Sequence, residues 1–341
     1  MSTTNKALTE LIEKHRVVVC CGSGGVGKTT TSAALAMQAA LMGKRVVVIT
    51  IDPAKRLATS LGLTSLSPDA SDLTENLNRA LHEIGAAPAA GRFSAVMPDS
   101  QKTFETFVRA MAGENQTMAT RVLKTSVYKI FTKEFSGTNE YMAMEKLFQL
   151  YHEDRFDLIV LDTPPSANTR LFLEAPQMLA DFFDDKVIRW IITPGSKILA
   201  SGVKKVLELL EKLTGKGFIS ELIEFTTALF ELRAQFTANL TAVGELLHQK
   251  DVAFLMVTSP ERLSKQDTQD FVSILKERDY RFWGFIINRV LSMTIGTSID
   301  ADPKPGQFAE TLKNFSPHEV KIMEDTFQLL LPTLRHEQEA A

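Results

Sequence analysis

The sequence predicts an α/β fold with a doubly wound, mostly parallel β-sheet, and three observations support this prediction. Apolar, β-branched segments of strand length recur along the chain, each bounded by turn or loop residues. Helical patterns follow some of them, at Gly27–Met42 and Pro260–Arg278. A glycine-rich segment joins the first apolar segment to the first of these helices. Strands that alternate with helices are typical of parallel sheets with helices on both faces.

The predicted strands are continuously apolar rather than alternating, which indicates that both of their faces are buried. They are Val17–Cys21, Arg45–Ile51, Phe156–Asp162, Val252–Ser259 and Trp283–Val290. The chain's two cysteines, Cys20 and Cys21, are neighbours on the first of these strands. Neighbouring side chains on a strand point to opposite faces, so a disulfide between these two is not expected. They are interpreted as small core residues in a reducing, cytoplasmic protein.

The composition is that of a globular protein and excludes several classes of partner. The chain has 341 residues, of which 44% are hydrophobic, and its net charge is -3. This mild acidic balance gives no reason to expect binding to nucleic acid. No apolar run approaches the roughly 20 residues of a membrane span, so no integral membrane segment is expected. The N-terminal residues lack the apolar core of a signal peptide, which also favours the cytoplasm.

Two long stretches without strand character, about Gln101–Asp154 and Glu174–Lys250, interrupt the series of strands. Apolar residues in the second stretch recur at intervals of three and four, as in Val206, Leu209 and Leu213, so amphipathic helices are expected. We therefore expect one α/β core with helical insertions that form a subdomain. The expected core comprises residues 1–100, 155–175 and 251–341, and the expected helical subdomain comprises residues 101–154 and 176–250.

The glycine-rich segment after the first strand fits two different phosphate-binding patterns. Gly22, Gly24 and Gly27 satisfy G-x-G-x-x-G, the dinucleotide pattern, and Asp52 follows at a spacing close to that of a ribose-binding acid. The same segment, continued to Lys28 and Thr29, satisfies G-x-x-x-x-G-K-[ST], the triphosphate pattern. A dinucleotide loop needs neither the lysine nor the hydroxyl, whereas a triphosphate loop needs both.

The triphosphate interpretation is favoured because the chain also supplies an acid at the end of a third apolar strand. Asp162 ends FDLIVLD, where a carboxylate can hold Mg²⁺, and the Thr29 hydroxyl is the other predicted metal ligand. Alone, Asp162 would equally fit a strand-end cap. The predicted nucleotide-binding residues of the loop are Gly22, Ser23, Gly24, Gly25, Val26, Gly27, Lys28, Thr29 and Thr30. The predicted fold is therefore that of a P-loop NTPase.

Two residues are predicted to take part in catalysis. Lys28 would reach the β- and γ-phosphates of the nucleotide. Asp52 ends the second strand, where a carboxylate could position, or accept a proton from, the water that attacks the γ-phosphate. An alternative for Asp52 is a turn acid or an N-cap before a helix at Ala54–Leu61.

The motifs GSGGVGKTTT, IDPAKRLA, LIVLDTPPSANTRLFLEAP and FIINRV resemble, in order and spacing, those of the ArsA-type ATPases. That family includes the arsenite-pump ATPase and the ATPase for guided entry of tail-anchored membrane proteins. The resemblance implies ATP hydrolysis, a nucleotide-gated homodimer and Mg²⁺ as cofactor. It also implies that Asp52 acts on the attacking water, that Asp162 helps to bind Mg²⁺, and that Asn288 recognises adenine. Without the resemblance, Asn288 would be read as a strand-end turn residue.

The chain departs from the family pattern in ways that limit what the resemblance implies. Ser23 stands where these ATPases usually carry a lysine that reaches the partner subunit's nucleotide. The C-x-x-C pair that binds zinc at the dimer interface of the tail-anchored-protein ATPase is absent, so no zinc is expected. The cysteine triad that binds arsenite is also absent, so activation by arsenite is not expected.

The expected function is a Mg²⁺-dependent, ATP-hydrolysing switch that handles a hydrophobic protein client such as a membrane helix. Phe182–Phe236 occupies the place of the family's client groove. Methionine side chains are flexible and apolar and suit such a surface, and the candidates are Met111, Met118, Met142 and Met144. The same residues are also typical of cores between packed helices. The alternatives are a weakly hydrolysing, nucleotide-dependent interaction module without a client-targeting role, and a P-loop kinase.

Overall fold

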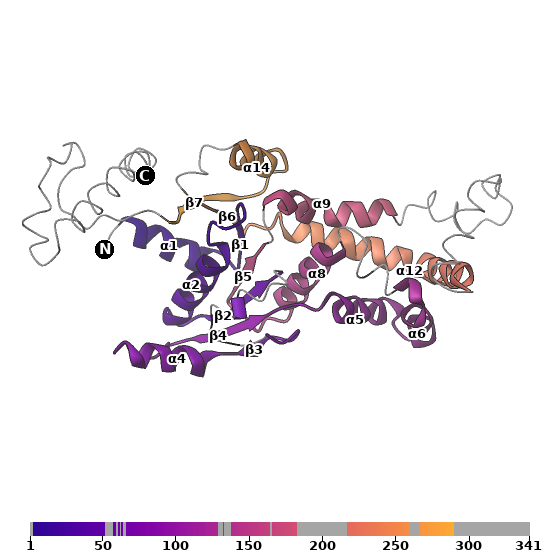
Figure 1. The fold of residues 1–341 in the computed structure, drawn as a ribbon, viewed down its shortest axis with the longest axis horizontal. Coiled ribbons are helices and arrows are strands. Elements are labelled where there is room, and N and C mark those ends of the chain that lie inside the picture. Colours follow the sequence, from indigo (N-terminus) through magenta and orange to yellow (C-terminus); the bar gives the residue numbers. More distant parts are fainter. Residues whose placement is uncertain are drawn as a thin grey trace, which may run out of the picture.

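A computed structural model of the chain shows a twisted sheet with helices on both of its sides (Figure 1). The structure describes residues 3–51, 57–58, 61, 63, 66–128, 132, 138–163, 166–182, 217–259 and 266–289, and the structural statements below concern these residues.

The sheet has seven strands in the order β3-β4-β2-β5-β1-β6-β7. Their bounds are β1 Val17–Cys21, β2 Arg45–Thr50, β3 Ser71–Asp72, β4 Arg92–Val96, β5 Leu158–Asp162, β6 Val252–Thr258 and β7 Phe282–Ile287. Neighbouring strands run parallel except at the β3–β4 edge, which is antiparallel. This topology confirms the predicted doubly wound, mostly parallel sheet.

The five predicted strands correspond to β1, β2, β5, β6 and β7, with ends that differ by up to three residues. The four most central of them, β2, β5, β1 and β6, are almost completely buried, which explains their continuous apolar sequences. Strands β3 and β4 were not predicted from the sequence. β3 has only two residues, and β4 (RFSAV) is short and contains a polar serine, so neither presents a continuous apolar run.

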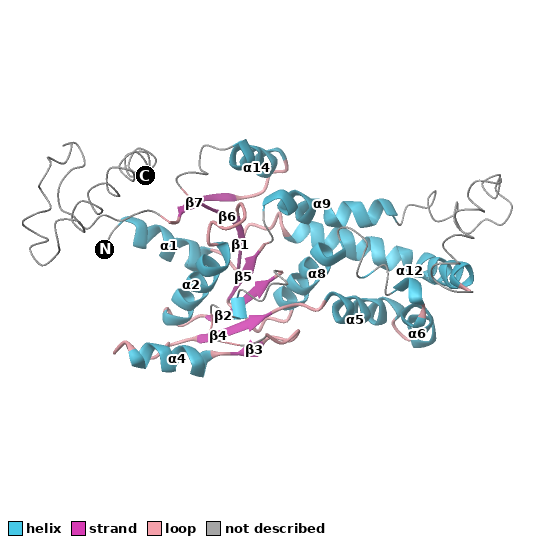
Figure 2. Cartoon of the chain, viewed as in Figure 1, coloured by secondary structure: helices cyan, strands magenta, loops and turns pink. Residues whose placement is uncertain are grey.

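The helices cover both faces of the sheet, and those of the helical stretches extend to the right of the strands in Figure 2. Their bounds are α1 Thr3–Lys14, α2 Lys28–Leu41, α4 Thr74–Glu83, α5 Ser100–Ala112, α6 Gln116–Lys124, α8 Thr138–His152, α9 Ser166–Phe182, α12 Phe218–Leu246 and α14 Gln266–Glu277. The predicted helix at Gly27–Met42 corresponds to α2. The predicted amphipathic segment around Val206 lies outside the described residues.

Two hydrophobic clusters lie on opposite faces of the sheet. The first cluster contains alternate strand residues such as Val17, Val19 and Cys21, together with side chains of α5, α6, α8, α9, α12 and α14. The second contains the intervening residues such as Val18 and Cys20, with side chains of α1, α2 and α4. The two cysteines therefore point to opposite faces, as predicted, and both are buried and unbridged.

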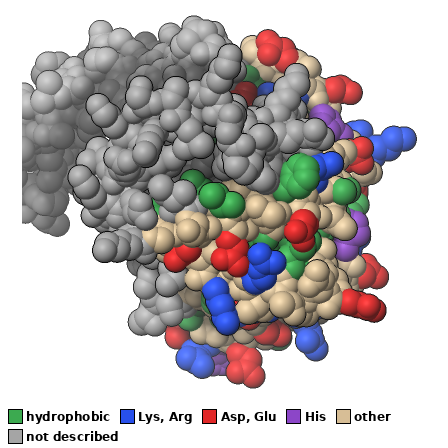
Figure 3. Space-filling view, turned by 90° about the vertical axis from the view of Figure 1, so that its right-hand side faces the viewer, with side chains coloured by type: hydrophobic (Ala, Val, Ile, Leu, Met, Phe, Trp, Pro, Cys, Tyr) green, Lys and Arg blue, Asp and Glu red, His purple; other side chains and the backbone are tan. Residues whose placement is uncertain are grey.

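The methionines of the helical stretches belong to the core. Met118, Met142 and Met144 are buried, and Met111 is partly buried against the same cluster. Among the described residues, the exposed large hydrophobic side chains are Leu41, Ile84, Ile223 and Phe285, and only Ile223 belongs to a helix of the helical stretches. On the face drawn in Figure 3, apolar side chains lie singly among charged ones in the part that is not grey. None of the described helices is both long and apolar enough to cross a membrane.

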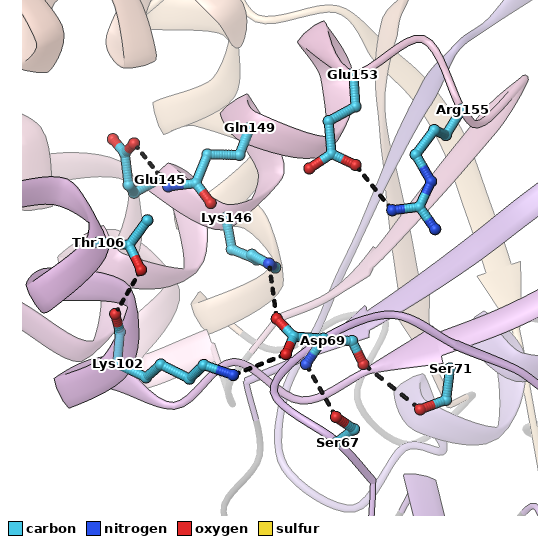
Figure 4. A network of polar contacts seen from close by, with 10 residues as sticks. All are labelled: Ser67, Asp69, Ser71, Lys102, Thr106, Glu145, Lys146, Gln149, Glu153 and Arg155. Carbon is cyan, nitrogen blue, oxygen red and sulfur yellow. Dashed lines mark hydrogen bonds and ion pairs between the residues drawn. The ribbon is translucent and has the colours of Figure 1, made fainter. Parts of the chain in front are cut away.

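A small polar network joins the segment before β3 to the helices α5 and α8 (Figure 4). The Asp69 carboxylate accepts a hydrogen bond from Lys102 Nζ of α5 at 2.7 Å and lies 3.9 Å from Lys146 Nζ of α8. The Lys102 ammonium lowers the pKa of Asp69 below its ordinary value. The chain crosses the sheet edge here, since Leu66 packs in one hydrophobic cluster and Ala70 against the other.

Candidate functional site

The glycine loop lies between β1, a central strand, and the N-terminus of α2. Two of its glycines are required by their surroundings. Gly22 has φ 150°, and a Cβ there would lie 2.0 Å from the carbonyl oxygen of Val257 on β6. Gly27 has φ 92°, and a Cβ there would lie 2.2 Å from the side-chain nitrogen of Asn288. A side chain at either position would displace the loop from the ends of β6 and β7.

The N-cap residue of α2 provides no side-chain cap. It is Gly27, which lies in the left-handed conformation and makes no side-chain hydrogen bond to the first turn. The first backbone hydrogen bond of the helix is donated by Thr31 N to Gly27 O at 2.9 Å. The earlier N–H groups have no partner within the helix, and together with the helix dipole they favour an anion at this end.

Lys28 and Ser23 contact each other inside the loop. Lys28 is only 7% exposed, and its Nζ donates a hydrogen bond to the carbonyl oxygen of Ser23 at 3.0 Å. The ammonium group therefore lies against the loop itself. The side chain of Ser23 is also buried, and its hydroxyl has no hydrogen-bond partner among the described residues. Ser23 thus points into the protein, so it does not extend outward from the loop.

Three side chains from different elements meet at the end of β5. Asp162 is 1% exposed, and its Oδ2 accepts hydrogen bonds from Thr29 Oγ1 at 2.7 Å and from Thr50 Oγ1 at 3.0 Å. Thr29 comes from the first turn of α2 and Thr50 from the end of β2. The structure therefore brings together Thr29 and Asp162, the two residues that the sequence predicts as metal ligands.

The Thr29–Asp162 pair fits the ligand chemistry of Mg²⁺. A hydroxyl that donates its proton to a carboxylate keeps its oxygen lone pairs for a cation. Mg²⁺ usually takes one or two protein oxygens and fills its other positions with water and substrate phosphates. The described residues contain no group of three or more His, Cys, Asp and Glu side chains that could hold a metal ion, and such a group is not needed for this type of site.

Thr163, directly after β5, is tied to the neighbouring strand β1. Its N–H and its hydroxyl both donate to the carbonyl oxygen of Cys20, at 3.2 and 2.9 Å. Burial raises the pKa of the Cys20 thiol to about 12 and raises that of Cys21 further. Both thiols are therefore protonated near neutral pH, which makes them poor nucleophiles and poor ligands for soft metals.

Asn288 lies at the end of β7 and contacts the glycine loop. Its side-chain nitrogen donates a hydrogen bond to the carbonyl oxygen of Val26 at 2.9 Å, and its backbone N–H donates to Thr258 O at 2.8 Å. The residue predicted to recognise adenine is thus fixed to the loop predicted to hold the phosphates. Its second amide hydrogen and its side-chain oxygen are additional hydrogen-bonding groups that a base could use.

Two further residues, Asp52 and Thr50, belong to the end of the second predicted strand. Asp52, the predicted catalytic acid, lies outside the described residues. Thr50, which contacts Asp162, was not identified from the sequence, although a hydroxyl two residues before a strand-end acid is a signal that points to this part of the sheet.

Comparison with known proteins finds similarity over most of the chain. A family model described as anion-transporting ATPase matches residues 15–330. A putative arsenical pump-driving ATPase 2 from Aquifex aeolicus is 28% identical over 279 residues, which cover 81% of this chain and 80% of the relative.

More distant relatives carry other names. An ATPase ASNA1 homolog 1 from Paramecium tetraurelia is 24% identical over 279 residues, 79% of this chain and 73% of that protein. An ATPase GET3 from Candida glabrata is 25% identical over 287 residues, 81% of this chain and 73% of the relative.

Proposed function

The chain belongs to the anion-transporting ATPase family, and on that premise we propose that it is a Mg²⁺-dependent switch driven by ATP hydrolysis. It is an ATPase with the α/β fold of P-loop NTPases. The observation that carries the Mg²⁺-dependent part of the proposal is the 2.7 Å hydrogen bond between Thr29 and Asp162 beside an uncapped helix N-terminus. This pairing supports the proposal because a hydroxyl and a carboxylate of the kind that suits Mg²⁺ lie next to N–H groups of the kind that suits phosphate.

Each residue of the loop has a distinct part in the proposed mechanism. The N–H groups from Gly24 to Thr30 bind phosphate oxygens, and Gly22 and Gly27 keep the backbone close enough for this. Lys28 exchanges its contact with the Ser23 carbonyl for the β- and γ-phosphates, whose negative charge it offsets. Mg²⁺, when bound, neutralises the charge that develops on the phosphates. Asp52 orients the attacking water or accepts its proton.

The proposed assembly is a homodimer whose subunits close around ATP and separate after hydrolysis. Family membership supports this part of the proposal. In the lysine-bearing members of the family, a lysine at this position contacts the partner subunit's nucleotide. Ser23 points inward, so in the proposed dimer other residues would have to make that contact. The protein is proposed to act in the cytoplasm.

The proposed client is a hydrophobic protein segment rather than an arsenical. The names of several relatives refer to arsenical pumps, but the two cysteines of this chain are buried on opposite faces of the sheet. They cannot together bind an arsenical through their thiols in this conformation. The client surface would have to use residues other than the buried methionines of α6 and α8.

The experiment that tests the proposal measures ATP turnover and molar mass in solution, with and without Mg²⁺ and a non-hydrolysable ATP analogue. We expect Mg²⁺-dependent turnover and a dimer in the presence of the analogue. Lys28→Ala and Asp52→Asn should each remove turnover. A monomer under all conditions would overturn the gated-dimer model, and undiminished turnover in either variant would overturn its assigned role.

Two alternatives are tested by the same measurements. Tight ATP binding with negligible turnover would favour a nucleotide-dependent interaction module. Phosphate transfer to an acceptor other than water would favour a P-loop kinase.

A further inference from the structure

The hydroxyl of Thr50 lies in a buried position next to the predicted metal ligands. Thr50 is completely buried at the end of β2, and its Oγ1 donates to Asp162 Oδ2 at 3.0 Å. Thr29 Oγ1 donates to the same oxygen from the other side, at 2.7 Å. One carboxylate oxygen is thereby held between a strand and a helix.

The pairing of two strands sets the position of this contact. β2 and β5 are parallel neighbours, and Thr50 is the register partner of Asp162. The ladder extends one step further, because Ile51 N donates to Asp162 O at 3.3 Å. The hydroxyl of Thr50 therefore has a defined position relative to the carboxylate, set by the sheet rather than by a flexible loop.

The orientation of the carboxylate matters because rotation about the terminal bond of aspartate is broad and weakly restricted. A carboxylate that helps to hold Mg²⁺ needs one oxygen in a constant position, and residues that hydrogen-bond to metal-binding groups supply that constraint. Thr29 also has a direct part in the proposed Mg²⁺ site, whereas Thr50 contacts Asp162 without being placed among the ligands.

We propose that Thr50 is a positioning residue for the Mg²⁺ site, which orients Asp162 through the hydrogen bond from its hydroxyl. This inference rests on the proposed Mg²⁺-dependent function. Thr50 is the last residue of β2, the strand that leads to Asp52. Its hydrogen bond therefore joins β2 to β5, the strand that ends in Asp162.

The test is the Mg²⁺ dependence of nucleotide binding by the full chain, measured with a fluorescent ADP analogue, and of ATP turnover. Thr50→Val keeps the shape of the side chain and removes the donor. We expect it to raise the Mg²⁺ concentration for half-maximal binding about 10-fold, the usual range for loss of a group that orients a metal ligand. Nucleotide affinity without Mg²⁺ should stay within about twofold of the original, because the phosphate loop is unchanged.

Two matched variants separate positioning from a general loss of structure. Thr50→Ser keeps the hydroxyl and should restore Mg²⁺ dependence to within about threefold of the original. Thr226→Val makes the same chemical change at a buried threonine of α12, whose hydroxyl donates only within its own helix, to Leu222 O at 2.7 Å, and should leave Mg²⁺ dependence unchanged. Circular dichroism and thermal unfolding report whether each variant is folded, and Thr50→Ala replaces Thr50→Val if the latter is not.

The outcomes decide between the two proposals. If the original chain binds nucleotide without any Mg²⁺ dependence, the proposed function fails. If Mg²⁺ dependence is present but Thr50→Val matches Thr226→Val, or if Thr50→Ser is as impaired as Thr50→Val, the positioning role of Thr50 is overturned and the proposed function stands.

Discussion

The two faces of the sheet are packed with side chains of different size. On the face covered by α1, α2 and α4, the helix α2 contributes mainly alanines, and Phe93 is the one buried aromatic residue in that cluster among the described residues. The opposite face is rich in aromatic side chains, namely Phe104, Phe107, Tyr128, Tyr141, Phe156, Phe172, Phe225, Phe236, Phe254, Phe271 and Tyr280.

This difference relates to what each face does. Small side chains allow α2 to lie close to the sheet, which fixes its N-terminus beside the ends of β1 and β5, where the loop and Asp162 are found. Large aromatic side chains fill the wider spaces between several helices, and they belong to one hydrophobic cluster that runs from the sheet to α5 and α6. The helices α5 and α6 therefore share a hydrophobic core with the strands that carry the site.

The largest expected effect concerns the loop that precedes α2, the alanine-rich helix, because Gly22 of this loop lies close to the backbone of β6. Gly22→Ala would place a Cβ 2.0 Å from the Val257 carbonyl oxygen and would force a backbone shift. We expect it to lower the free energy of unfolding of the nucleotide-free chain by roughly 3 kcal/mol or more. Urea denaturation followed by circular dichroism measures this change.

Gly25→Ala is the matched control for that prediction. Gly25 also has a positive φ, 81°, but a Cβ there meets nothing within 4 Å. In the control, the free energy of unfolding should fall by about 1 kcal/mol, the cost of holding an alanine in the left-handed conformation. Equal losses in the two variants would mean that conformation, and not the close approach to β6, sets the requirement for glycine.

On the aromatic-rich side, the sensitive feature is a buried carboxylate between α8 and α12. Glu145 is 5% exposed and accepts hydrogen bonds from Asn239 Nδ2 at 2.6 Å, Tyr141 OH at 3.2 Å and Gln149 Nε2 at 3.1 Å. Glu145→Ala would remove the acceptor of the Tyr141 hydroxyl and of Gln149 Nε2, leave Asn239 Nδ2 only its 3.1 Å hydrogen bond to Tyr141 OH, and open a cavity. The expected loss is about 2–3 kcal/mol in the free energy of unfolding. Equilibrium unfolding at neutral pH measures it.

The same carboxylate predicts a pH dependence. Burial raises the pKa of Glu145 above its ordinary value of 4.5, so the folded chain holds this proton more tightly than the unfolded chain does. The contribution of Glu145 to the free energy of unfolding is therefore fully present below pH 4.5, and it is lost as the pH rises through the folded-state pKa. The free energy of unfolding of the original chain should fall over that interval relative to Glu145→Gln, which cannot titrate. A constant difference between the two would contradict the raised pKa.

The central strands and the loop could be predicted from the sequence because their signals are local. A strand buried on both faces reads as a continuous apolar run, and the loop pattern contains the lysine and hydroxyl that distinguish its chemistry. β4 and β3 could not be predicted in this way, since a serine interrupts one and the other has two residues.

The role of Thr50 and the position of the methionines depend on contacts between distant parts of the chain. Thr50 and Asp162 are 112 positions apart, and only the register of β2 against β5 brings them together. An apolar helical pattern is the same for a helix that packs on others and for one that lines a groove, so the sequence left both interpretations of Met142 and Met144 open. The structure places both in the core.

The smallest expected effect concerns Asp69, where the chain passes from one face of the sheet to the other. Its ion pair with Lys102 is mostly exposed, with side-chain exposures of 56% for Lys102 and 68% for Asp69. A double-mutant cycle of Asp69→Asn and Lys102→Met should give a coupling energy of about 0.5 kcal/mol at low salt. Because solvent ions screen exposed charges, the coupling should fall further in high salt.

This last measurement distinguishes two ways in which the faces could be joined. A coupling near zero at low salt would mean that the Lys102 ion pair adds nothing to the apolar contacts that hold α5 against the segment before β3. A salt-sensitive coupling of the expected size would mean that a weak, reversible contact also acts at this crossing. Such a contact could open without loss of the fold, because its strength is small beside that of the aromatic cluster that packs α5 and α8 against the sheet.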